Sequence, residues 1–426
     1  MAIILKNSLK LNVFHNKLSP FLRRRQSETQ TSSLLSLTTS SCGLIESTIK
    51  DKLQTKLKFG NTLNKIEITS SAVLEANDCT KGRKSVGVLG GGAWGTAIAD
   101  LIGRNVAKHK HLFHEEVLFY VRDESLRLII EKTRQNIRYL SAIKLPLNVR
   151  PVSSLSDAVS KSDVLIFVIP HQYLQDLCYA INDSISTRNP IGISLSKGLH
   201  IDSAGNLELN SQIIHRMLGI PVGVLSGANI AIEVAQRQYS EATLVNPLTN
   251  DKNCEELFRC LFECNLFRVS FCNDGPTVEM CGALKNIVAI GCGLVDGLGY
   301  GMNTKAAALS CGVREMIRFV EVFHPKYELS TFFQNCGIGD IIASSFGGRN
   351  RKVSEALIKS SKSIEMLEKQ LLRGQKLQGP QTAHVVYQLL QNKQLLNEFP
   401  FFSAIHRICN RTMDPKDLIQ AIKSSP

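Results

Sequence analysis

The stretch Val-Gly-Val-Leu-Gly-Gly-Gly-Ala-Trp-Gly-Thr-Ala-Ile-Ala-Asp, residues 86–100, decides the fold. A short apolar run enters a glycine turn, and an alanine-rich segment of helical character follows. Gly90, Gly92 and Gly95 fit the pattern G-x-G-x-x-G in a strand–turn–helix setting. Gly90 permits the tight turn, Gly92 removes a Cβ that would collide with a pyrophosphate, and Gly95 lets the helix pack close to the strand. The phosphates would lie at a helix N-terminus, so the stretch predicts a dinucleotide-binding site.

Composition limits the class of protein. With 426 residues, 43% hydrophobic and 20% charged, the chain is long enough for two ordinary domains and suits a soluble globular protein. The formal charge of +13 fits attraction of anionic small molecules such as phosphates and dinucleotides. Nucleic acid is not expected as a partner, because no basic patch interleaved with aromatic residues is present.

The cysteines predict a reducing compartment. Twelve cysteines are scattered without any C-x-x-C pair, and Cys281, Cys292 and Cys311 have apolar surroundings. This spacing favours reduced, packed thiols over a disulfide framework or a zinc site, so no metal is expected.

Residues 1–83 differ from the rest of the chain. They begin with a basic, acid-poor segment that contains Arg23-Arg24-Arg25 and a run rich in Ser and Thr from Ser27 to Ser41. This composition is typical of an organellar presequence, and it equally fits a disordered extension that carries no address. No apolar run reaches the ~18 residues of a spanning helix, so no membrane is expected as a partner.

Alternating patterns predict an α/β fold from residue 84 to 273. Continuous apolar runs bounded by Gly, Pro and Asp indicate strands that are buried on both faces, as in a parallel sheet covered by helices. A Rossmann-like, doubly wound domain is therefore expected, followed by a mainly α-helical domain over 274–426. A helix with a Ser cap is expected within 359–371. The expected strands are 85–89, 116–121, 163–169, 191–195, 222–225, 241–245 and 266–270.

Lys285 is the most chemically suggestive residue of the second half. It lies in an apolar segment of small residues, Glu279-Met-Cys-Gly-Ala-Leu-Lys-Asn, where burying an ammonium is costly. A snorkelling side chain, or a pair with Glu279, is the structural alternative, but Glu279 is six residues away and off the facing positions of a helix. Burial and a nearby cation would lower the pKa of Lys285 toward neutrality and suit it to proton transfer.

Two further clusters carry polar side chains. Gly347-Gly348-Arg349-Asn350-Arg351-Lys352 predicts an exposed turn in which the planar guanidinium of Arg349 binds a phosphate, although a solvated basic turn has the same composition. Ser196-Lys197-Gly198 and Pro170-His171-Gln172-Tyr173 each follow a predicted strand, where open α/β sheets bind ligands. For His171 a positional role is as plausible as a catalytic one.

Seven motifs follow one another between about Lys84 and about Ile422. They are Gly-Gly-Gly-Ala-Trp-Gly (90–95), Ile-Pro-His-Gln-Tyr (169–173), Leu-Ser-Lys-Gly (195–198), Gly-Ala-Asn-Ile-Ala (227–231), Cys-Gly-Ala-Leu-Lys-Asn (281–286), Gly-Gly-Arg-Asn-Arg-Lys (347–352) and Gly-Gln-Lys-Leu-Gln-Gly-Pro (374–380). In this order they resemble the NAD-dependent glycerol-3-phosphate dehydrogenases, especially the soluble eukaryotic form. The resemblance implies interconversion of dihydroxyacetone phosphate and sn-glycerol 3-phosphate with NAD as cofactor, in a cytoplasmic homodimer.

The resemblance also implies roles for residues at matching positions. Lys285 would be the general acid and base, with Lys197 near the substrate oxygens as a second cation. Asn286, Asp340 and Thr304 would orient the reacting group, while Arg349 and Asn350 would bind the substrate phosphate. The implied cofactor contacts are Gly90, Gly91, Gly92, Ala93, Trp94, Gly95, Arg122, Tyr173, Ala231, Arg349, Lys376 and Gln378.

Arg122 departs from the pattern of the resembled family. It lies at the end of the second predicted strand, where an acid would hold the ribose 2′-OH of NAD and an arginine can accommodate the 2′-phosphate of NADP. By its position, Arg122 stands where soluble eukaryotic members of the resembled family carry an aromatic residue. We expect NADH to be preferred by a reduced margin, because Asp123 and Glu124 flank Arg122 and would repel a 2′-phosphate.

Three other functions fit parts of the sequence. A related dehydrogenase of the 6-phosphogluconate type also pairs a Rossmann domain with a helical domain and a Lys-Asn step. A non-catalytic, nucleotide-sensing protein could have kept the fold, but the presence of Lys285, Lys197 and Arg349 argues against it. The flavin-dependent, membrane-bound glycerol-3-phosphate dehydrogenase is disfavoured because no further flavin signature accompanies the glycine turn.

Overall fold

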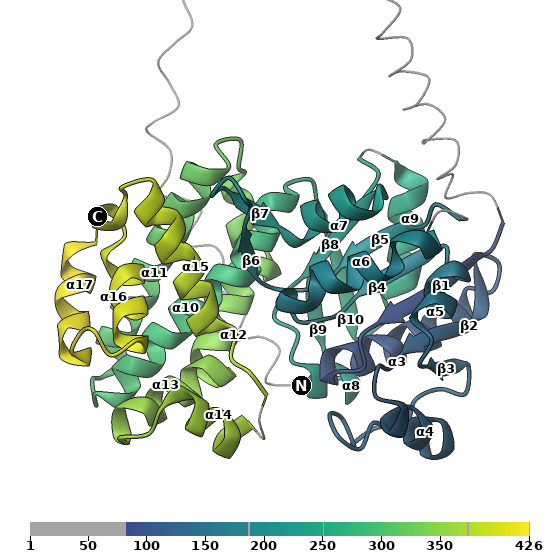
Figure 1. Cartoon of the computed structure of the whole chain (residues 1–426), viewed down its shortest axis with the longest axis horizontal. Helices are drawn as coiled ribbons and strands as arrows, with labels where there is room; N and C mark the ends of the chain where they lie inside the picture. The colour runs from purple at the N-terminus through teal and green to yellow at the C-terminus, as the bar shows by residue number, and fades with distance from the viewer. Residues whose placement is uncertain (1–81, 186–187, 250, 373–374, 426) are drawn as a thin grey trace, which may run out of the picture. The chain divides into compact units, whose positions relative to one another are not determined.

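The computed structural model describes residues 82–185, 188–249, 251–372 and 375–425. The expected presequence or disordered extension therefore lies almost wholly outside the described residues. The described residues form one compact unit. Within that unit an eight-stranded sheet is followed by a set of helices, as predicted (Figure 1).

The sheet has the strand order β10-β9-β8-β5-β4-β1-β2-β3. Every pair of neighbours is parallel except β8 and β9, which are antiparallel, so the sheet is mixed rather than wholly parallel as expected. The first strand of the sequence lies inside the sheet, between β4 and β2. The strands are β1 (Lys84–Leu89), β2 (Phe113–Tyr120), β3 (Val149–Val152), β4 (Val164–Phe167), β5 (Ile191–Ser194), β8 (Val222–Ser226), β9 (Ser240–Val245) and β10 (Phe267–Cys272).

Both faces of the sheet are covered, which explains the continuous apolar runs. In β4, Val164 and Ile166 belong to a core shared with α3 and α9, whereas Leu165 and Phe167 belong to a second core shared with α6 and α7. The helices of this part are α3 (Ala93–Lys108), α4 (Glu124–Thr133), α5 (Leu155–Ser160), α6 (Leu174–Ile185), α7 (Asn210–Leu218), α8 (Ala231–Ala235) and α9 (Lys252–Phe262), with the short η1 (His171–Tyr173).

Residues 275–425 are helical, as predicted. They form α10 (Gly275–Gly297), α11 (Met302–Phe323), α12 (Asp340–Gly347), α13 (Arg349–Lys359), α14 (Ile364–Leu372), α15 (Gly379–Asn392), α16 (Pro400–Cys409) and α17 (Leu418–Ser424), with the short turns η2 (Leu329–Phe333), η3 (Asn335–Gly339), η4 (Leu396–Glu398) and η5 (Pro415–Asp417). The Ser-capped helix expected within 359–371 begins at Ile364, and Ser363 Oγ accepts the N–H of Met366.

Helix α10 is the centre of this helical part. It contacts α11, α12, α13, α15 and α16, and its residues from Thr277 to Val295 are all buried. Among the described residues it is the one helix whose length and mean hydropathy could suit a membrane span, which the sequence analysis did not expect. Its complete burial is that of a core helix.

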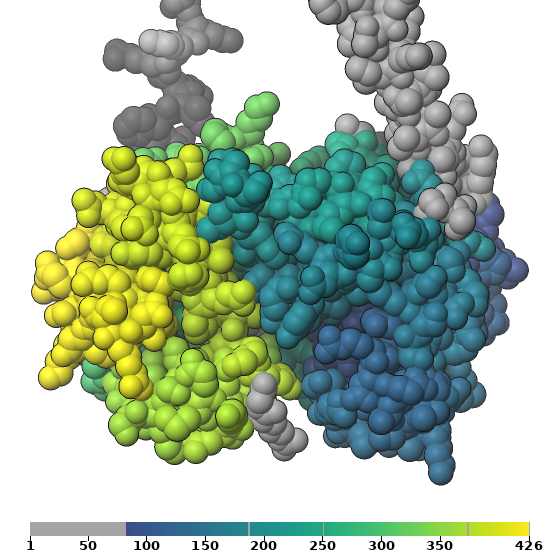
Figure 2. All heavy atoms as spheres, viewed as in Figure 1, coloured from purple at the N-terminus to yellow at the C-terminus, as the bar shows by residue number. Residues whose placement is uncertain are grey.

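A two-stranded hairpin of the first part packs into the core of the second. β6 (Leu199–Ile201) pairs with β7 (Leu207–Leu209), and Leu199 and Leu209 are buried among residues of α10, α11 and α15. In Figure 2 the green to yellow residues of the helical part adjoin teal residues of the first part. The hairpin follows Lys197 directly, so it anchors the Lys197 loop to the helical part.

Candidate active site

The glycine turn has the geometry that the sequence predicts. Gly90 has φ +135°, and a Cβ there would lie 2.2 Å from the Val168 carbonyl oxygen. A Cβ on Gly95 would lie 1.8 Å from the Gly90 carbonyl oxygen, so only glycine permits this approach of helix to strand. A Cβ on Gly92 would face open space.

The N-terminus of α3 is prepared for an anion. Gly92 is its N-cap residue, no side chain caps the helix, and its first turn holds no acid. Free N–H groups and the positive end of the helix dipole therefore face the open side of the turn, which fits the pyrophosphate of a dinucleotide. Asn136, which no sequence pattern marked, is buried, and its side-chain amide donates to the Gly91 carbonyl oxygen at 2.9 Å and so holds the turn.

Other predicted cofactor residues surround this turn. Trp94 and Ala231, the first residue of α8, are partly buried and pack against the same apolar cluster. Tyr173 is 49% exposed, and the guanidinium carbon of Arg122 lies 5.8 Å from the centroid of its ring. Arg122 and Tyr173 come from the ends of β2 and β4, the two neighbours of β1 in the sheet.

A charged cluster joins the two parts of the chain. The Asp340 carboxylate accepts a hydrogen bond from Lys285 Nζ at 2.9 Å on Oδ1 and one from Lys197 Nζ at 2.5 Å on Oδ2. Lys197 also donates to the Gly227 carbonyl oxygen at 3.1 Å. Lys285 and Asp340 are buried, whereas the side chain of Lys197 keeps 24% of its surface exposed. One buried carboxylate thus holds two ammonium groups, one from each part.

The surroundings tune the proton affinity of this cluster. The pKa of Lys285 is lowered to about 8: burial is the main cause, Lys197 adds to the shift, and Asp340 opposes it. Burial alone would raise the pKa of Asp340, but the two ammonium groups outweigh it, so the pKa lies below its usual value. Asp340 is therefore ionised at neutral pH, and Lys285 can exchange its proton near neutrality.

Ser344 belongs to this cluster and was missed by the sequence analysis. Its hydroxyl accepts a hydrogen bond from Lys285 Nζ and donates one to Asp340 Oδ1 at 3.2 Å. Ser344 lies four residues after Asp340 on α12, on the same side of that helix. The i, i+4 spacing could have found it. No hydrogen bond of the described residues joins the Thr304 side chain to the cluster, and the backbone N–H of Thr304 bonds to Gly301 at the start of α11.

Two predicted residues, Asn286 and Asn350, form a chain of amide hydrogen bonds beside the lysine. Asn350 Nδ2 donates to Asn286 Oδ1 at 2.8 Å, and Asn350 Oδ1 accepts the N–H of Gly379 at 3.2 Å. Asn286 directly follows Lys285 on α10, so this chain ties α10, α13 and α15 together.

The predicted phosphate-binding turn ends at α13. Arg349 is the first residue of that helix, is exposed, and donates to Gln375 Oε1 at 2.8 Å. Lys376 pairs with Glu368 at 2.8 Å, and the Gln378 carbonyl oxygen accepts the hydroxyl of Thr382. The structure therefore links Gln375 to Arg349, and no described contact joins Lys376 or Gln378 to the glycine turn.

The loop that carries Lys197 is held from several sides. Asn210 Nδ2 donates to the carbonyl oxygens of Ser196 and Gly198, each at 3.1 Å. Gly198 has φ +153°, and a Cβ there would lie 2.3 Å from the His171 ring. Burial, together with His200, lowers the pKa of His171 to about 4, so this imidazole is neutral and packs as a positional residue.

Glu279 does not pair with Lys285. Its carboxylate instead accepts hydrogen bonds from the hydroxyl and backbone N–H of Ser211 on α7. The offset of six residues on α10 explains this, since the two side chains point in different directions. The pairing alternative for Lys285 is therefore wrong, and its partner comes from α12.

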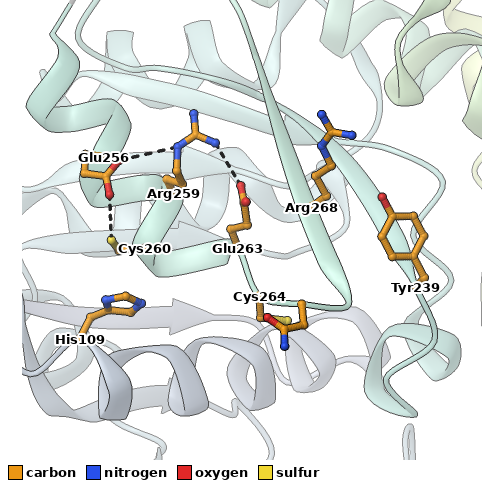
Figure 3. A pocket seen from close by; sticks show the side chains of 9 residues that line it. His109, Tyr239, Glu256, Arg259, Cys260, Glu263, Cys264 and Arg268 are labelled. Carbon is orange, nitrogen blue, oxygen red and sulfur yellow. Dashed lines mark hydrogen bonds and ion pairs between the residues drawn. The ribbon is translucent and has the colours of Figure 1, made fainter.

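A cavity of about 480 Å³ lies elsewhere on the first part of the chain (Figure 3). Its lining includes His109, Tyr239, Arg259 and Arg268, none of which was a predicted site residue. Arg259 pairs with Glu256 and Glu263 at its rim. The guanidinium charge is thus neutralised within the protein, unlike the excess positive charge of the Lys285 cluster.

Comparison with known families follows the same division of the chain. The family described as NAD-dependent glycerol-3-phosphate dehydrogenase N-terminus matches residues 85–253, and the one described as NAD-dependent glycerol-3-phosphate dehydrogenase C-terminus matches residues 274–420. The chain is 48% identical over 347 residues to the cytoplasmic glycerol-3-phosphate dehydrogenase [NAD(+)] of Drosophila virilis, which covers 80% of this chain and 97% of that protein. It is 43% identical to the human glycerol-3-phosphate dehydrogenase 1-like protein, over 80% of this chain and 97% of that one.

Solved structures agree with these relatives. The glycerol-3-phosphate dehydrogenase of Plasmodium falciparum superposes with a TM-score of 0.75 at 38% identity, covering 80% of this chain and 96% of that one. The corresponding enzyme from Saccharomyces cerevisiae gives 0.73 at 36% identity, covering 80% and 99%. Both the glycine turn and the charged cluster lie within the residues that the two family descriptions match.

Proposed function

The chain belongs to the NAD-dependent glycerol-3-phosphate dehydrogenase family, and from that premise we propose how its residues carry the reaction. It is an oxidoreductase that interconverts dihydroxyacetone phosphate and sn-glycerol 3-phosphate with NAD(H). The family match favours this reaction over a 6-phosphogluconate-type dehydrogenase or a nucleotide-sensing protein. We assign residues 84–273 to binding the dinucleotide and 274–426 to binding the substrate.

The Lys285–Asp340–Lys197 cluster carries the mechanistic proposal. When bound, NADH supplies the hydride that reduces the substrate carbonyl carbon. Lys285 gives its proton to the carbonyl oxygen as negative charge develops there, and takes it back in the reverse direction. Lys197, whose side chain is the more open of the two, stabilises the same oxygen. Asp340 holds both ammonium groups in place and Asn286 orients the substrate beside them.

The remaining residues bind and orient. Arg349 and Asn350 hold the substrate phosphate through charge-assisted and amide hydrogen bonds. The turn from Gly90 to Gly95 and the N-terminus of α3 hold the pyrophosphate. Dihydroxyacetone-phosphate-dependent oxidation of NADH, followed by absorbance, tests the whole assignment, with 6-phosphogluconate and dihydroxyacetone as comparison substrates. Turnover of 6-phosphogluconate in preference would overturn it.

Ser344 is a positioning residue whose loss should change both rate and pH dependence. We expect Ser344→Ala to lower kcat/KM about tenfold, because the Lys285 ammonium loses a hydrogen bond that fixes its direction. The alkaline limb of the pH profile should also move to lower pH, since the hydroxyl stabilises the charged lysine. Steady-state kinetics over a pH series measure both effects.

The neighbouring serine offers a control. Ser345 is buried on the same helix but makes no hydrogen bond to Lys285 or Asp340 among the described contacts. Ser345→Ala should leave the pH profile in place, and Ser344→Thr should recover most of the rate. A Ser344→Ala profile identical to wild type would remove Ser344 from the site.

We further propose that the enzyme acts as a homodimer in the cytoplasm. Relatives are named as cytoplasmic enzymes, which supports the location. Ile338, Ile342 and Phe346 form an exposed apolar stripe on one side of η3 and α12, which suits contact with a second copy. Sedimentation of the wild type and of Ile342→Lys tests the dimer. Imaging tagged chains with and without residues 1–80 tests the location against an organelle.

A further inference from the structure

Arg122 occupies the position that reads the adenosine ribose. Tyr120, the last residue of β2, pairs with Leu89 of β1, and its carbonyl oxygen accepts the N–H of Gly90. Arg122 follows Tyr120 by two residues. It therefore lies just past the end of β2, beside the glycine turn that follows β1. In Rossmann folds a side chain at this place contacts the ribose 2′-OH or a 2′-phosphate.

The Arg122 guanidinium is available to a ligand. Its side chain is exposed, and its described contact is with the face of the Tyr173 ring, at 5.8 Å. Throughout residues 82–185, 188–249, 251–372 and 375–425 it forms no ion pair with a carboxylate. A planar guanidinium that keeps its donors free matches the oxygens of a phosphate.

The two acids beside Arg122 are already engaged. Asp123 Oδ1 caps α4 by accepting the N–H of Leu126, and its Oδ2 pairs with Arg138 at 2.5 Å. Glu124 accepts hydrogen bonds from Arg127 at 2.8 to 3.0 Å. Both carboxylates are therefore engaged with neighbouring groups. Arg127 also pairs with Glu131, so one net negative charge remains in this group, and the repulsion of a 2′-phosphate expected from the sequence is reduced rather than removed.

We propose that Arg122 forms a site for the 2′-phosphate of NADP(H), so that this enzyme binds and uses NADPH as well as NADH. Arg122 donates to the phosphate oxygens on the ribose, while Tyr173 and the glycine turn serve both cofactors alike. The hydride transfer to the carbonyl carbon and the proton transfer from Lys285 to the carbonyl oxygen are the same with either dinucleotide. Arg122 is therefore the residue that sets cofactor selectivity.

The single tryptophan of the chain makes direct binding measurable. Trp94 lies within the glycine turn, so its fluorescence should report the reduced dinucleotide bound there. We expect dissociation constants for NADPH and NADH that agree within about tenfold. Among fragments without nicotinamide, 2′,5′-ADP should displace NADH more strongly than 5′-ADP, a readout that does not depend on turnover.

Substitutions of Arg122 distinguish a contact with the 2′-phosphate from a contact with the adenine base. Arg122→Gln and Arg122→Phe should each weaken NADPH and 2′,5′-ADP by about 10- to 100-fold, because a charge-assisted hydrogen bond is lost. NADH, which has no 2′-phosphate, should lose much less affinity than NADPH in both variants. Arg188→Gln, which removes an exposed arginine paired with Asp163, is the control for net charge and should change neither cofactor.

Two outcomes would overturn the proposal. One is a wild type that binds NADH but not NADPH. The other is an Arg122→Gln variant that loses NADH and NADPH equally, which would show that Arg122 stacks on the adenine only. Either result leaves the reduction of dihydroxyacetone phosphate by NADH untouched, so it would not count against the assigned reaction.

Discussion

Replacing Lys285 with alanine is expected to reduce kcat by roughly 10²- to 10⁴-fold, the range for losing general acid–base catalysis. The binding of NADH should change little, because the dinucleotide is held mainly by the glycine turn of the other part. Lys285→Arg should rescue poorly, since a guanidinium keeps its proton far above neutral pH. Steady-state rates and the Trp94 fluorescence titration measure the two effects separately.

The pH dependence follows from the pKa of about 8 for Lys285. Reduction of the ketone needs the protonated lysine, so kcat/KM should be full below this pKa and fall as the pH rises through it. Oxidation of glycerol 3-phosphate needs the neutral lysine, so its kcat/KM should rise over the same interval. Both limbs should vanish in Lys285→Ala.

Lys305 provides the matched control. It is another buried lysine of the helical part and pairs with Asp296 at 2.7 Å, away from Asp340. Lys305→Ala should lower stability and keep both pH limbs. If Lys285→Ala turned over at nearly the wild-type rate while Lys197→Ala were inactive, the roles of the two lysines would be reversed.

Loss of Arg349 is the second large effect. Arg349→Ala should lose about 3 kcal/mol in kcat/KM, because a charge-assisted, forked interaction with the substrate phosphate disappears. Arg349→Lys should recover only part, since a point charge cannot form two parallel hydrogen bonds. Kinetics with dihydroxyacetone phosphate and with unphosphorylated dihydroxyacetone test this.

Dihydroxyacetone tests whether Arg349 acts through the substrate phosphate. With this substrate the wild type and Arg349→Ala should have similar, low kcat/KM values, because dihydroxyacetone has no phosphate for Arg349 to bind. Lys352→Ala, which removes an exposed charge three residues further along, should behave as wild type with both substrates. Near-normal kinetics of Arg349→Ala with dihydroxyacetone phosphate would withdraw the assignment.

Local patterns predicted much of this architecture. The glycine turn, the buried strands and the helical second part follow from apolar runs and turn residues, which are properties of neighbouring residues. The edge strand β3 was missed because Arg150 and Pro151 interrupt its apolar pattern, as edge positions allow. The antiparallel pairing of β8 with β9 was also missed, because an apolar run indicates burial on both faces and does not determine the direction of the strand.

In the candidate active site, too, neighbouring residues in the sequence predicted single side chains but not the contacts between distant ones. Lys285 was recognisable because a lysine in an apolar helix is unusual. Its pairing with Asp340 spans 55 residues, so no periodicity of α10 could predict it. Ser344 was missed, although its hydroxyl accepts a hydrogen bond from the lysine, whereas Thr304, which the resemblance implied, makes no side-chain hydrogen bond to the cluster within the described residues. Residues that act by meeting across elements need the fold to be known first.

The burial of Lys285 weakens the fold that contains it. A lysine whose pKa falls from 10.5 to about 8 on folding costs about 3 kcal/mol while it is charged in both states, below pH 8. As the pH rises from about 8 toward 10.5 the folded protein releases this proton first, and the cost is relieved. The proposed mechanism therefore places a destabilising residue at the centre of α10, and Lys285→Met is expected to give a more heat-resistant but inactive protein.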